Sequence, residues 1–336
     1  MRIGLVGTGR IGAAHAAALA AHPEATEVIL ADADAERARQ VAARLGVRAA
    51  GDVTELFVPG TVDALVIAAA TSAHPELIIA GARAGLPVFC EKPVAPDVPG
   101  TLAVLAEVER TGADVHIGFQ RRFDAGYQRA RQAVHDGEIG EVHRVHAITA
   151  DPEPPHASYI PASGGIFRDC HVHDFDIVRW VTGREIVEVF AIGSNRGAAF
   201  FAEAGDVDNS AALLRLDDDT LVTLQGSRYN GAGYDVRMEI AGTRGTVVVG
   251  LDDRTAAGSA EPGVAFPEGL PHPDFWSRFS PAYQAELSAF FRMGAGAAPS
   301  PCTVADALAA VLAAEAADRS MRERRPVRVA EVAPVP

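Results

Sequence analysis

The stretch Arg2-Ile-Gly-Leu-Val-Gly-Thr-Gly-Arg-Ile-Gly12 decides the fold of this chain. Its first half, residues 2–7, is a short apolar run typical of a buried strand, and the alanine-rich segment after it has the composition of a helix. Between the two stand Gly7, Gly9 and Gly12, which permit a tight turn and a close approach of the backbone to a ligand. The stretch therefore predicts a strand, a glycine turn and a helix, the first unit of a parallel sheet.

The same alternation of strands and helices continues to about residue 120. The predicted strands after the first are residues 28–31, 64–69, 88–90 and 115–118, and the predicted helices are residues 11–21, 35–45, 76–84 and 101–110. Strands that alternate with helices at this spacing imply right-handed βαβ units. Residues 1–120 are therefore predicted to form a Rossmann domain of the α/β class, with a doubly wound parallel sheet.

Residues 121–336 have a different pattern, in which strands follow one another with short turns between them. The predicted strands are residues 141–150, 185–192, 210–216, 221–227, 234–241 and 246–249, and the predicted helices are about residues 167–181, 282–293 and 304–324. Residues 250–274 are rich in Gly and Pro and are expected to form a surface loop. The second half is therefore predicted to be an α+β domain with a mostly antiparallel open sheet.

Charge and composition narrow the class of partner. The net charge of −14 argues against nucleic acid or an anionic membrane, since both attract a basic surface. The three cysteines, Cys90, Cys170 and Cys302, are odd in number and widely spaced, which suits a reducing compartment. No apolar run approaches the roughly 20 residues of a membrane span. We therefore expect a cytoplasmic protein that acts on a small molecule.

The glycine turn predicts a dinucleotide cofactor. In the turn Gly7-Thr-Gly9-Arg10-Ile11-Gly12 the backbone, at Arg10 and Ile11 as well as at the glycines, is expected to hold a pyrophosphate at the helix N-terminus. The strand before the turn and the helix after it make this motif far more specific than its letters alone.

Asp32 ends the second predicted strand, 20 residues after Gly12. A carboxylate there accepts hydrogen bonds from the ribose hydroxyls and repels a 2′-phosphate, which favours NAD over NADP. Arg37 lies close enough in the sequence to keep NADP as the alternative. Asp32 could instead cap the helix that starts at Ala35.

Two further segments follow strands of the same sheet, at the edge where ligands bind. Ala70, Thr71 and His74 come after the strand of residues 64–69, so we expect them along the cofactor; His74 could equally cap the next helix. Glu91-Lys92-Pro93 follows the strand of residues 88–90, and Lys92 is the only lysine among 30 basic residues. Arginine cannot give up a proton near neutral pH, so Lys92 is a candidate for a titratable amine in catalysis, or else a chance survivor of arginine-rich coding.

The segment Ser163-Gly-Gly-Ile-Phe-Arg-Asp-Cys-His-Val-His-Asp-Phe-Asp176 is the second candidate for chemistry. On a single helix, Asp169 and His173 are four residues apart and share a face. A histidine oriented by a carboxylate is a suitable general base, although a capped helix with a structural ion pair is the alternative. His171 lies on another face and is expected to be structural, and the spacing supports no metal site.

These residues resemble the glucose–fructose oxidoreductase, inositol dehydrogenase and MocA (Gfo/Idh/MocA) family. The resemblance covers nearly the whole chain and rests on the glycine turn, on Glu91-Lys92-Pro93, and on Gly164-Gly165 followed by Asp169 and His173. Within the family the chain is most similar to the inositol 2-dehydrogenases, in the segments Gly118-Phe-Gln-Arg-Arg-Phe-Asp124, Asp151-Pro-Glu-Pro-Pro155 and Gly233-Tyr-Asp235. It departs from the family pattern at Ala69-Ala70, where Thr-Pro is common, and at Cys170-His-Val172.

The resemblance implies a set of roles. Lys92 would contact the reacting oxygen and share in proton relay, His173 would take the hydroxyl proton, and Asp169 would orient His173. Glu91 and Lys92 would also border the cofactor. Three more side chains, besides Lys92, Asp169 and His173, would hold ring hydroxyls of the substrate: Arg122, Asp151 and Tyr234.

The resemblance further implies an activity, the NAD-dependent oxidation of a secondary hydroxyl of a cyclitol, with myo-inositol oxidised to 2-keto-myo-inositol as the favoured reaction. The alternatives are another cyclitol, an aminocyclitol, a hexose or a glycoside as substrate, and an NAD-dependent glycosidase. A nucleotide-sensing protein that retains the fold is a non-enzymatic alternative. By analogy with the family, a homodimer or homotetramer is expected.

Overall fold

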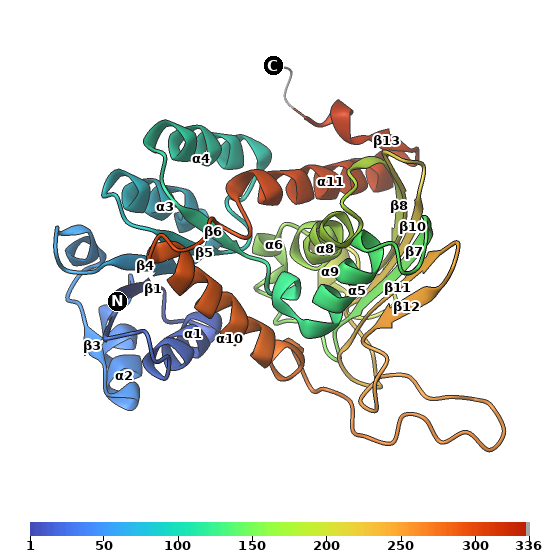
Figure 1. Cartoon of the computed structure of the whole chain (residues 1–336), viewed down its shortest axis with the longest axis horizontal. Helices are drawn as coiled ribbons and strands as arrows, with labels where there is room; N and C mark the ends of the chain where they lie inside the picture. The colour runs from blue at the N-terminus through green and yellow to red at the C-terminus, as the bar shows by residue number, and fades with distance from the viewer. Residues whose placement is uncertain (334–336) are drawn as a thin grey trace. The chain divides into compact units, whose positions relative to one another are not determined.

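The computed structural model describes residues 1–333, which divide into two compact units (Figure 1). Unit 1 comprises Met1–Phe119 and Tyr283–Leu308, and unit 2 comprises Gln120–Ala282 and the chain from Ala309 onward. The chain leaves unit 1 at Phe119 and returns to it over Tyr283–Leu308, whereas the sequence prediction assigned all residues after 120 to the second domain. The return has a physical cause, because Leu287 and Phe290 are fully buried in the core of unit 1.

Unit 1 contains a six-stranded parallel sheet in the order β3-β2-β1-β4-β5-β6. The strands are β1 (Arg2–Val6), β2 (Glu27–Ala31), β3 (Arg48–Ala49), β4 (Ala64–Ile67), β5 (Val88–Glu91) and β6 (Val115–Gly118). The connecting helices are α1 (Arg10–Ala20), α2 (Ala35–Leu45), η1 (Val53–Phe57), η2 (Thr71–Ala73), α3 (His74–Arg83) and α4 (Val98–Thr111). Helices cover both faces, with α3 and α4 on one side and α1 and α2 on the other (Figure 1). The predicted doubly wound sheet is confirmed.

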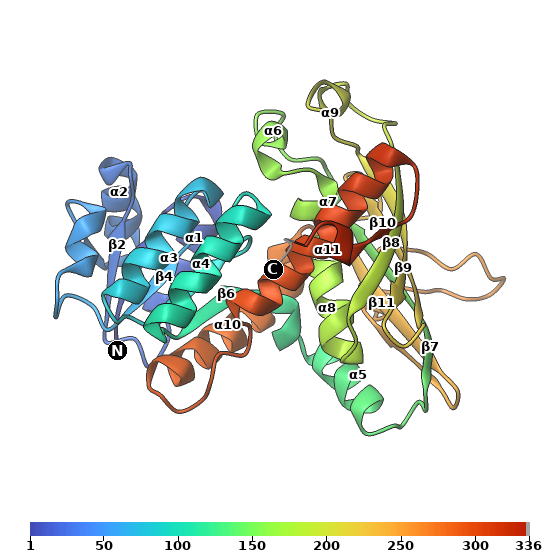
Figure 2. The same cartoon turned by 90° about the horizontal axis from the view of Figure 1, so that it is seen from above.

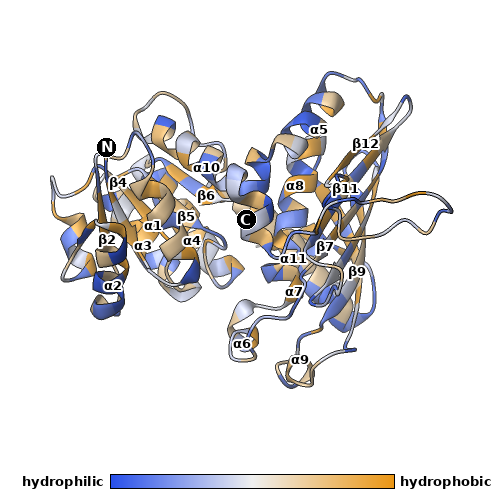
Figure 3. Ribbon diagram, turned by 90° about the horizontal axis from the view of Figure 1, so that it is seen from below, coloured by the Kyte–Doolittle hydropathy of each residue, from blue (hydrophilic) through white to orange (hydrophobic). Residues whose placement is uncertain are grey.

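The strands of unit 1 are apolar because both of their faces are covered. Ile3, Leu5 and Val66 are completely buried, and the strands are drawn largely in the hydrophobic colour in Figure 3. The strand order reverses at β1, which has β2 on one side and β4 on the other. Ligands of such sheets bind outside the carboxyl ends of the strands at this reversal, so the segments after β1 and β4 are the place for a cofactor.

Unit 2 contains a seven-stranded sheet in the order β12-β11-β7-β10-β9-β8-β13. The strands are β7 (Val142–Ala150), β8 (Ile186–Ser194), β9 (Asn209–Leu216), β10 (Leu221–Ser227), β11 (Asp235–Gly242), β12 (Thr246–Val249) and β13 (Val327–Arg328). Only β7 and β10 run parallel to each other among the described strands of this sheet. The predicted mostly antiparallel sheet is confirmed, and the parallel pair proves important for the site.

The helices of unit 2 lie on one face of this sheet (Figure 2). They are η3 (Gln120–Phe123), α5 (Ala125–His135), α6 (Ile160–Ser163), α7 (Ile166–Asp169), α8 (Val172–Thr182), α9 (Phe200–Glu203), most of α11 (Val304–Glu323) and η4 (Val329–Glu331). The side chains of β9 and β10 alternate accordingly, with Leu214 and Val222 buried while Leu213 and Leu221 are exposed. None of the helices within residues 1–333 is both long and apolar enough to cross a bilayer.

Two predicted helices differ from the structure. The helix expected over residues 167–181 is two helices, α7 and α8, because the backbone N–H groups of Cys170 and His171 both bond to the Ile166 carbonyl and the regular ladder stops there. The helix expected from residue 282 is α10 (Phe275–Gly294), which starts a full two turns earlier and contains Pro281. Helix α5 was not predicted at all.

Candidate functional site

The glycine turn of unit 1 has the geometry of a phosphate-binding turn. Gly7 has φ +95°, and a Cβ on it would lie 2.5 Å from the Ala68 carbonyl oxygen after β4. A Cβ on Gly12 would overlap the Gly7 carbonyl oxygen, whereas a Cβ on Gly9 would meet no protein atom within 4 Å. Gly7 and Gly12 are therefore required by the protein itself. Gly9 leaves open space at the start of α1, where a pyrophosphate fits the exposed N–H groups.

Asp32 directly follows β2 and is held in place by several donors. Its Oδ2 accepts hydrogen bonds from the Thr8 backbone N–H (2.6 Å) and hydroxyl (2.8 Å), and its Oδ1 accepts one from the Asp34 N–H. Burial alone would raise the pKa of Asp32, but the bonds from Arg37, Thr8 and Asp34 lower it to about 2. Asp32 is thus a fixed anion at the predicted ribose position. The cap of α2 is Asp34, so the alternative role for Asp32 is wrong.

Arg37 forms an ion pair with Asp32, with Nη2 2.5 Å from Oδ1 and Nε 3.2 Å from Oδ2. Its side chain is half exposed. The pairing places a cation at the edge of the predicted ribose site. Because a cation there could bind a 2′-phosphate once Asp32 is removed, a substitution of Asp32 tests the choice between NAD and NADP.

His74 is almost completely buried, and its ring bridges two segments of unit 1. Nδ1 lies 2.7 Å from the Pro93 carbonyl oxygen and Nε2 lies 3.1 Å from the Ala69 carbonyl oxygen. The residue at the cap of α3 is Ala73, so the capping alternative for His74 is wrong. His74 instead joins the turn after β4 to the segment after Lys92, and Ala70 and Thr71 lie beside it with part of their surface exposed.

Lys92 follows directly on β5 and is flanked by two anchored residues. Before it, Glu91 Oε1 lies 2.6 Å from Nε2 of His15, a completely buried residue of α1. After it, the Pro93 carbonyl is bonded to His74. The Lys92–Pro93 peptide bond is cis. Lys92 itself is half-buried, so the sheet and two histidines fix the backbone from which its amine extends.

Arg228 lies at the end of a strand of unit 2 and binds two predicted site carboxylates, Asp151 and Asp169. The parallel pairing of β7 with β10 places Ala150 opposite Ser227, and the Asp151 N–H donates to the Ser227 carbonyl at 2.9 Å. The next residues along the two strands, Asp151 and Arg228, therefore lie side by side. Arg228 Nη2 donates to Asp169 Oδ2 at 2.8 Å, and Nη1 lies 3.5 Å from Asp151 Oδ2.

The two carboxylates on Arg228 have different surroundings. Asp169 accepts a second hydrogen bond, at Oδ1 from the Tyr159 hydroxyl (2.9 Å), and its side chain is 12% exposed. Asp151 is 26% exposed. Burial raises the pKa of Asp151, Arg228 opposes this and Asp169 adds to it. One carboxylate is thus fully engaged by the protein and the other faces solvent.

Tyr234 precedes β11, whose first residue Asp235 pairs with Ala150. The start of β11 therefore meets the end of β7, and Tyr234 lies near Asp151. Burial raises the pKa of the Tyr234 phenol, so that it is a neutral donor. Within residues 1–333, neither Tyr234 Oη nor Asp151 Oδ1 has a hydrogen-bond partner. This pair of groups is available to the hydroxyls of a ligand.

Arg122, which was expected to hold a substrate hydroxyl, lies in a buried ion pair with Asp176. Its Nε and Nη2 bind the two oxygens of Asp176 at 2.8 and 2.5 Å, and both side chains are buried. A second buried pair lies beside it, in which Arg121 Nη1 bonds to Asp174 at 2.5 Å. These pairs join η3 to α8, so Arg122 contributes to the position of the helix that carries His173.

His171 and His173 occupy different environments on the same helix. His171 is completely buried, with Nδ1 2.7 Å from Asp174 Oδ2 and Nε2 2.8 Å from the Ser210 hydroxyl, as suits a structural residue. His173 lies in the first turn of α8 and is half-buried. Because α7 ends at Asp169, the argument that Asp169 and His173 share one helical face is wrong; their proposed partnership has to come from the packing of two short helices.

The sequence analysis missed Arg228 and Tyr159. Arg228 stands one residue after a correctly predicted strand, as Asp151 does, and that shared position was the available signal. Tyr159 lies in the Pro-rich segment before α6 and gave no signal that periodicity could detect.

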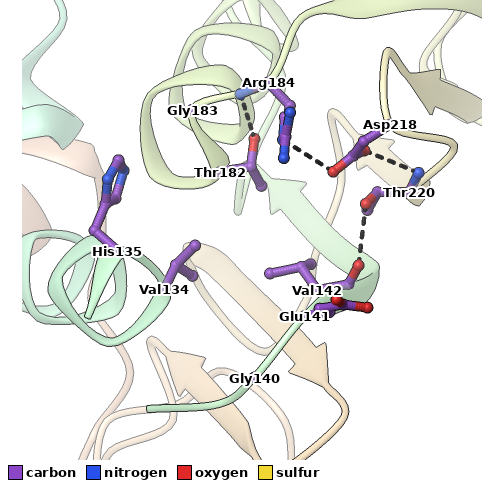
Figure 4. Close-up of a pocket in the computed structure, with 10 residues that line it drawn as sticks. All are labelled: Val134, His135, Gly140, Glu141, Val142, Thr182, Gly183, Arg184, Asp218 and Thr220. Atoms are coloured by element: carbon purple, nitrogen blue, oxygen red, sulfur yellow. Dashed lines mark hydrogen bonds and ion pairs between the residues drawn. The ribbon is translucent and has the colours of Figure 1, made fainter. Parts of the chain in front are cut away.

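A cavity of about 330 Å³ lies elsewhere in unit 2, at the carboxyl ends of α5 and α8 (Figure 4). Its polar lining is engaged within the protein: Arg184 lies 3.0 Å from Asp218, and the Thr220 hydroxyl donates to the Val142 carbonyl. No predicted site residue lines it.

Comparison with known proteins supports the assignment of both units. Residues 1–119 match an oxidoreductase family with an NAD-binding Rossmann fold, and residues 127–248 match the GFO/IDH/MocA C-terminal domain. The chain is 40% identical to myo-inositol dehydrogenase Hyg17 of Streptomyces leeuwenhoekii over 326 residues, 95% of this chain and 97% of that protein. It is 35% identical to myo-inositol 2-dehydrogenase of Thermotoga maritima, over 99% of each chain. The structure of scyllo-inositol dehydrogenase from Lactobacillus casei with bound NAD(H) and scyllo-inositol superposes with a TM-score of 0.88, at 29% identity and covering 98% of this chain and 99% of that one.

Proposed function

The chain belongs to the GFO/IDH/MocA family of oxidoreductases, and from that membership we propose that it catalyses the NAD-dependent oxidation of a secondary ring hydroxyl of a cyclitol. The favoured substrate is myo-inositol, with 2-keto-myo-inositol as product. The observation that carries this proposal is the likeness to a myo-inositol dehydrogenase over nearly the full length of both chains. A second candidate is scyllo-inositol, because a solved relative binds it with NAD(H).

The residues of unit 1 fit NAD. The open space at Gly9, the N-terminus of α1 and the fixed anion Asp32 correspond to the pyrophosphate and the ribose hydroxyls. The chemistry that NAD supplies when bound is acceptance of a hydride from the carbon that carries the hydroxyl. Lys92, just past β5, is proposed to contact the oxygen of that hydroxyl and to share its proton, because a half-buried amine can do both.

Unit 2 is proposed to supply the base and most of the contacts to the ring. His173 takes the hydroxyl proton as the carbonyl forms, and Asp169 is proposed to orient His173. Asp151 Oδ1 accepts from one ring hydroxyl and the Tyr234 hydroxyl binds another, because both groups lack a partner within residues 1–333. Arg122 is reassigned to positioning α8 through Asp176.

The exposed face of the seven-stranded sheet is proposed to pack against a second copy of the chain, in a dimer or a tetramer. Ile192, Leu213 and Leu221 are each more than half exposed, on three neighbouring strands. Large apolar side chains exposed on neighbouring strands suit an interface with another chain. Light scattering of the wild-type protein and of Leu213→Glu tests this, and a monomeric wild type would contradict it.

We also propose that the protein works in the cytoplasm. Cys90, Cys170 and Cys302 are all free thiols, as a reducing compartment maintains them. Cell fractionation with an antibody to the native chain checks this.

The function is tested by following NADH formation with a panel of polyols. NAD or NADP is offered with myo-inositol, scyllo-inositol, an aminocyclitol, glucose and a glycoside. We expect NADH from a cyclitol, with myo-inositol giving the largest kcat/KM. Turnover of the glycoside without net NADH would replace the proposal by the glycosidase alternative, and silence with every cyclitol would contradict it.

A further inference from the structure

Arg228 contacts both carboxylates of the candidate site, Asp151 and Asp169. It is nearly fully buried, with 3% of its side chain exposed, and it reaches Asp169 with Nη2 and Asp151 with Nη1. A buried arginine in this position must itself be neutralised, and these two carboxylates neutralise it. Arg228 directly follows β10, Asp151 directly follows β7 and Asp169 ends α7, so a single guanidinium joins the ends of three elements.

We propose that Arg228 is a positioning residue that fixes Asp169 and leaves the outer oxygen of Asp151 for a substrate hydroxyl, an inference that rests on the dehydrogenase function proposed above. Each oxygen of Asp169 has a donor, Tyr159 at Oδ1 and Arg228 at Oδ2, so this carboxylate cannot rotate. Asp151 is held only through Oδ2, and its Oδ1 has no partner within residues 1–333. The guanidinium therefore determines the two roles: Asp169 is fixed through both oxygens, and Asp151 keeps one oxygen for a ligand.

The planar fork of arginine is required for this arrangement. One guanidinium presents separate nitrogens to the two carboxylates, whereas a lysine amine is a single point charge. The strand register places the guanidinium beside Asp151, since Ser227 pairs with Ala150 and the next residues, Arg228 and Asp151, lie side by side. Two carboxylates this close repel each other without a shared cation, and protonation of one would turn an acceptor into a donor.

Other titratable groups surround the three residues. Tyr159 and Tyr234 flank the carboxylates, and burial raises the pKa of each phenol, so both stay neutral over the working range of pH. Cys170 lies with Sγ 3.8 Å from Asp151 Oδ2. The buried pair Arg121–Asp174 is the next charged group toward α8. His173, the proposed base, is on α8 itself.

The test compares Arg228→Met and Arg228→Lys with the wild-type protein. Arg228→Met is expected to lower kcat/KM for the polyol by about 100-fold, the effect of misplacing a site group by an ångström, with NAD affinity unchanged. In the pH profile of kcat/KM for Arg228→Met, the fall in activity on the acid side should move to higher pH, because carboxylates without their counter-ion bind protons more readily. Arg228→Lys keeps the charge but not the fork, so its acid limb stays near the wild-type pH while kcat/KM remains low.

The matched control is Arg184→Met, which breaks another arginine–aspartate pair of unit 2, with Asp218, well outside the site. It is expected to retain the wild-type kcat/KM and pH profile. If Arg228→Met also retains both, the proposal is overturned. If Arg228→Met does not fold, Arg228→Lys decides: full kcat/KM in that variant shows that the fork is not needed and overturns the positioning role.

A second readout needs no activity and separates this inference from the proposed function. Cys90 and Cys302 are completely buried, so iodoacetamide should reach Cys170 first, as mass spectrometry of the peptide can show. Loss of the cation beside this thiol disfavours its thiolate, so Arg228→Met should slow alkylation of Cys170 at a given pH. If Arg228→Met slows alkylation of Cys170 but the wild-type protein oxidises no polyol, the charge arrangement around Arg228 is supported and the proposed function is refuted. Unchanged alkylation together with wild-type turnover would refute the arrangement.

Discussion

Glu91 Oε1 lies 2.6 Å from His15 Nε2, and this contact ties the residue before Lys92 to the helix that follows the glycine turn. The same ring of His15 packs edge-on against Phe89 of β5. Lys92, the proposed catalytic lysine, is therefore carried by a segment whose position depends on α1, the first helix of unit 1.

We predict that His15→Leu lowers kcat on the order of 10-fold, because the carboxylate of Glu91 loses its partner and the backbone of Lys92 shifts. The loss of a hydrogen bond to a charged group should also cost about 2 kcal/mol of stability. Steady-state kinetics and urea unfolding measure the two effects. The control is His22→Leu, just after the end of α1, where His22 stacks on Phe291 and touches neither Glu91 nor Lys92. An equal loss of kcat in this variant would argue against the link.

The glycine turn gives a contrasting pair of variants. Gly12→Ala places a Cβ on the Gly7 carbonyl, so we expect a loss of stability of about 3 kcal/mol or more. Gly9→Ala meets no protein atom, so its melting temperature should be that of the wild type, while NAD affinity falls at least about 10-fold as the methyl fills the pyrophosphate space. Thermal unfolding and a fluorescence titration with NADH distinguish them. Normal NAD affinity in Gly9→Ala would place the pyrophosphate elsewhere.

Asp32 is expected to determine the choice of cofactor. Asp32→Ser removes the anion that repels a 2′-phosphate and releases Arg37, which can then bind one. The ratio of kcat/KM for NAD to that for NADP should fall by about 100-fold, the equivalent of about 2.7 kcal/mol. Asp34→Ser, which alters the cap of α2 alone, is the control. The prediction fails if both variants keep the wild-type ratio.

The buried pair Arg121–Asp174 predicts a pH-dependent stability. Burial alone would raise the pKa of Asp174, but Arg121 and His171 outweigh it and the pKa is lowered. A group with a lowered pKa stabilises the fold above its unfolded value, about 4, and loses that contribution as the pH falls further.

Asp174→Asn should therefore cost about 3–5 kcal/mol at neutral pH. The difference from the wild type should shrink as the pH is lowered below about 4. Urea unfolding at a series of pH values measures it. A difference that is constant with pH would show that the charge of Asp174 does not matter.

The sequence predicted unit 1 well because its signals are local. A strand buried on both faces is a short apolar run, and a helix beside it is alanine-rich, so each bound of β1, β2 and β6 could be placed to within a residue. Gly12 is required by a contact within one turn, with the Gly7 carbonyl, and the sequence shows that spacing directly, whereas the contact that requires Gly7 is with Ala68, far along the chain. The contact of Glu91 with His15 could not be predicted from local sequence, because the two residues are 76 apart in the chain.

The site in unit 2 was predicted in part, for a related reason. Asp169 and His173 were proposed from their spacing, although the helix that justified that spacing is interrupted after Asp169. Arg228 was missed because its contacts depend on the parallel register of β7 with β10, which links residues 77 apart. The role expected for Arg122 came from the family resemblance, and nothing in the sequence indicated that its guanidinium binds Asp176.

The central claim is that Lys92, the only lysine of the chain, takes part in the chemistry rather than in folding or cofactor binding. The measurement that tests it most directly is kcat of Lys92→Arg with NAD and myo-inositol, alongside its melting temperature and NAD affinity. We predict an unchanged melting temperature, unchanged NAD affinity and a kcat at least about 100-fold lower, since arginine keeps the charge but cannot exchange the proton. A Lys92→Arg enzyme that turns over at the wild-type rate would contradict the account and leave proton transfer to His173 alone.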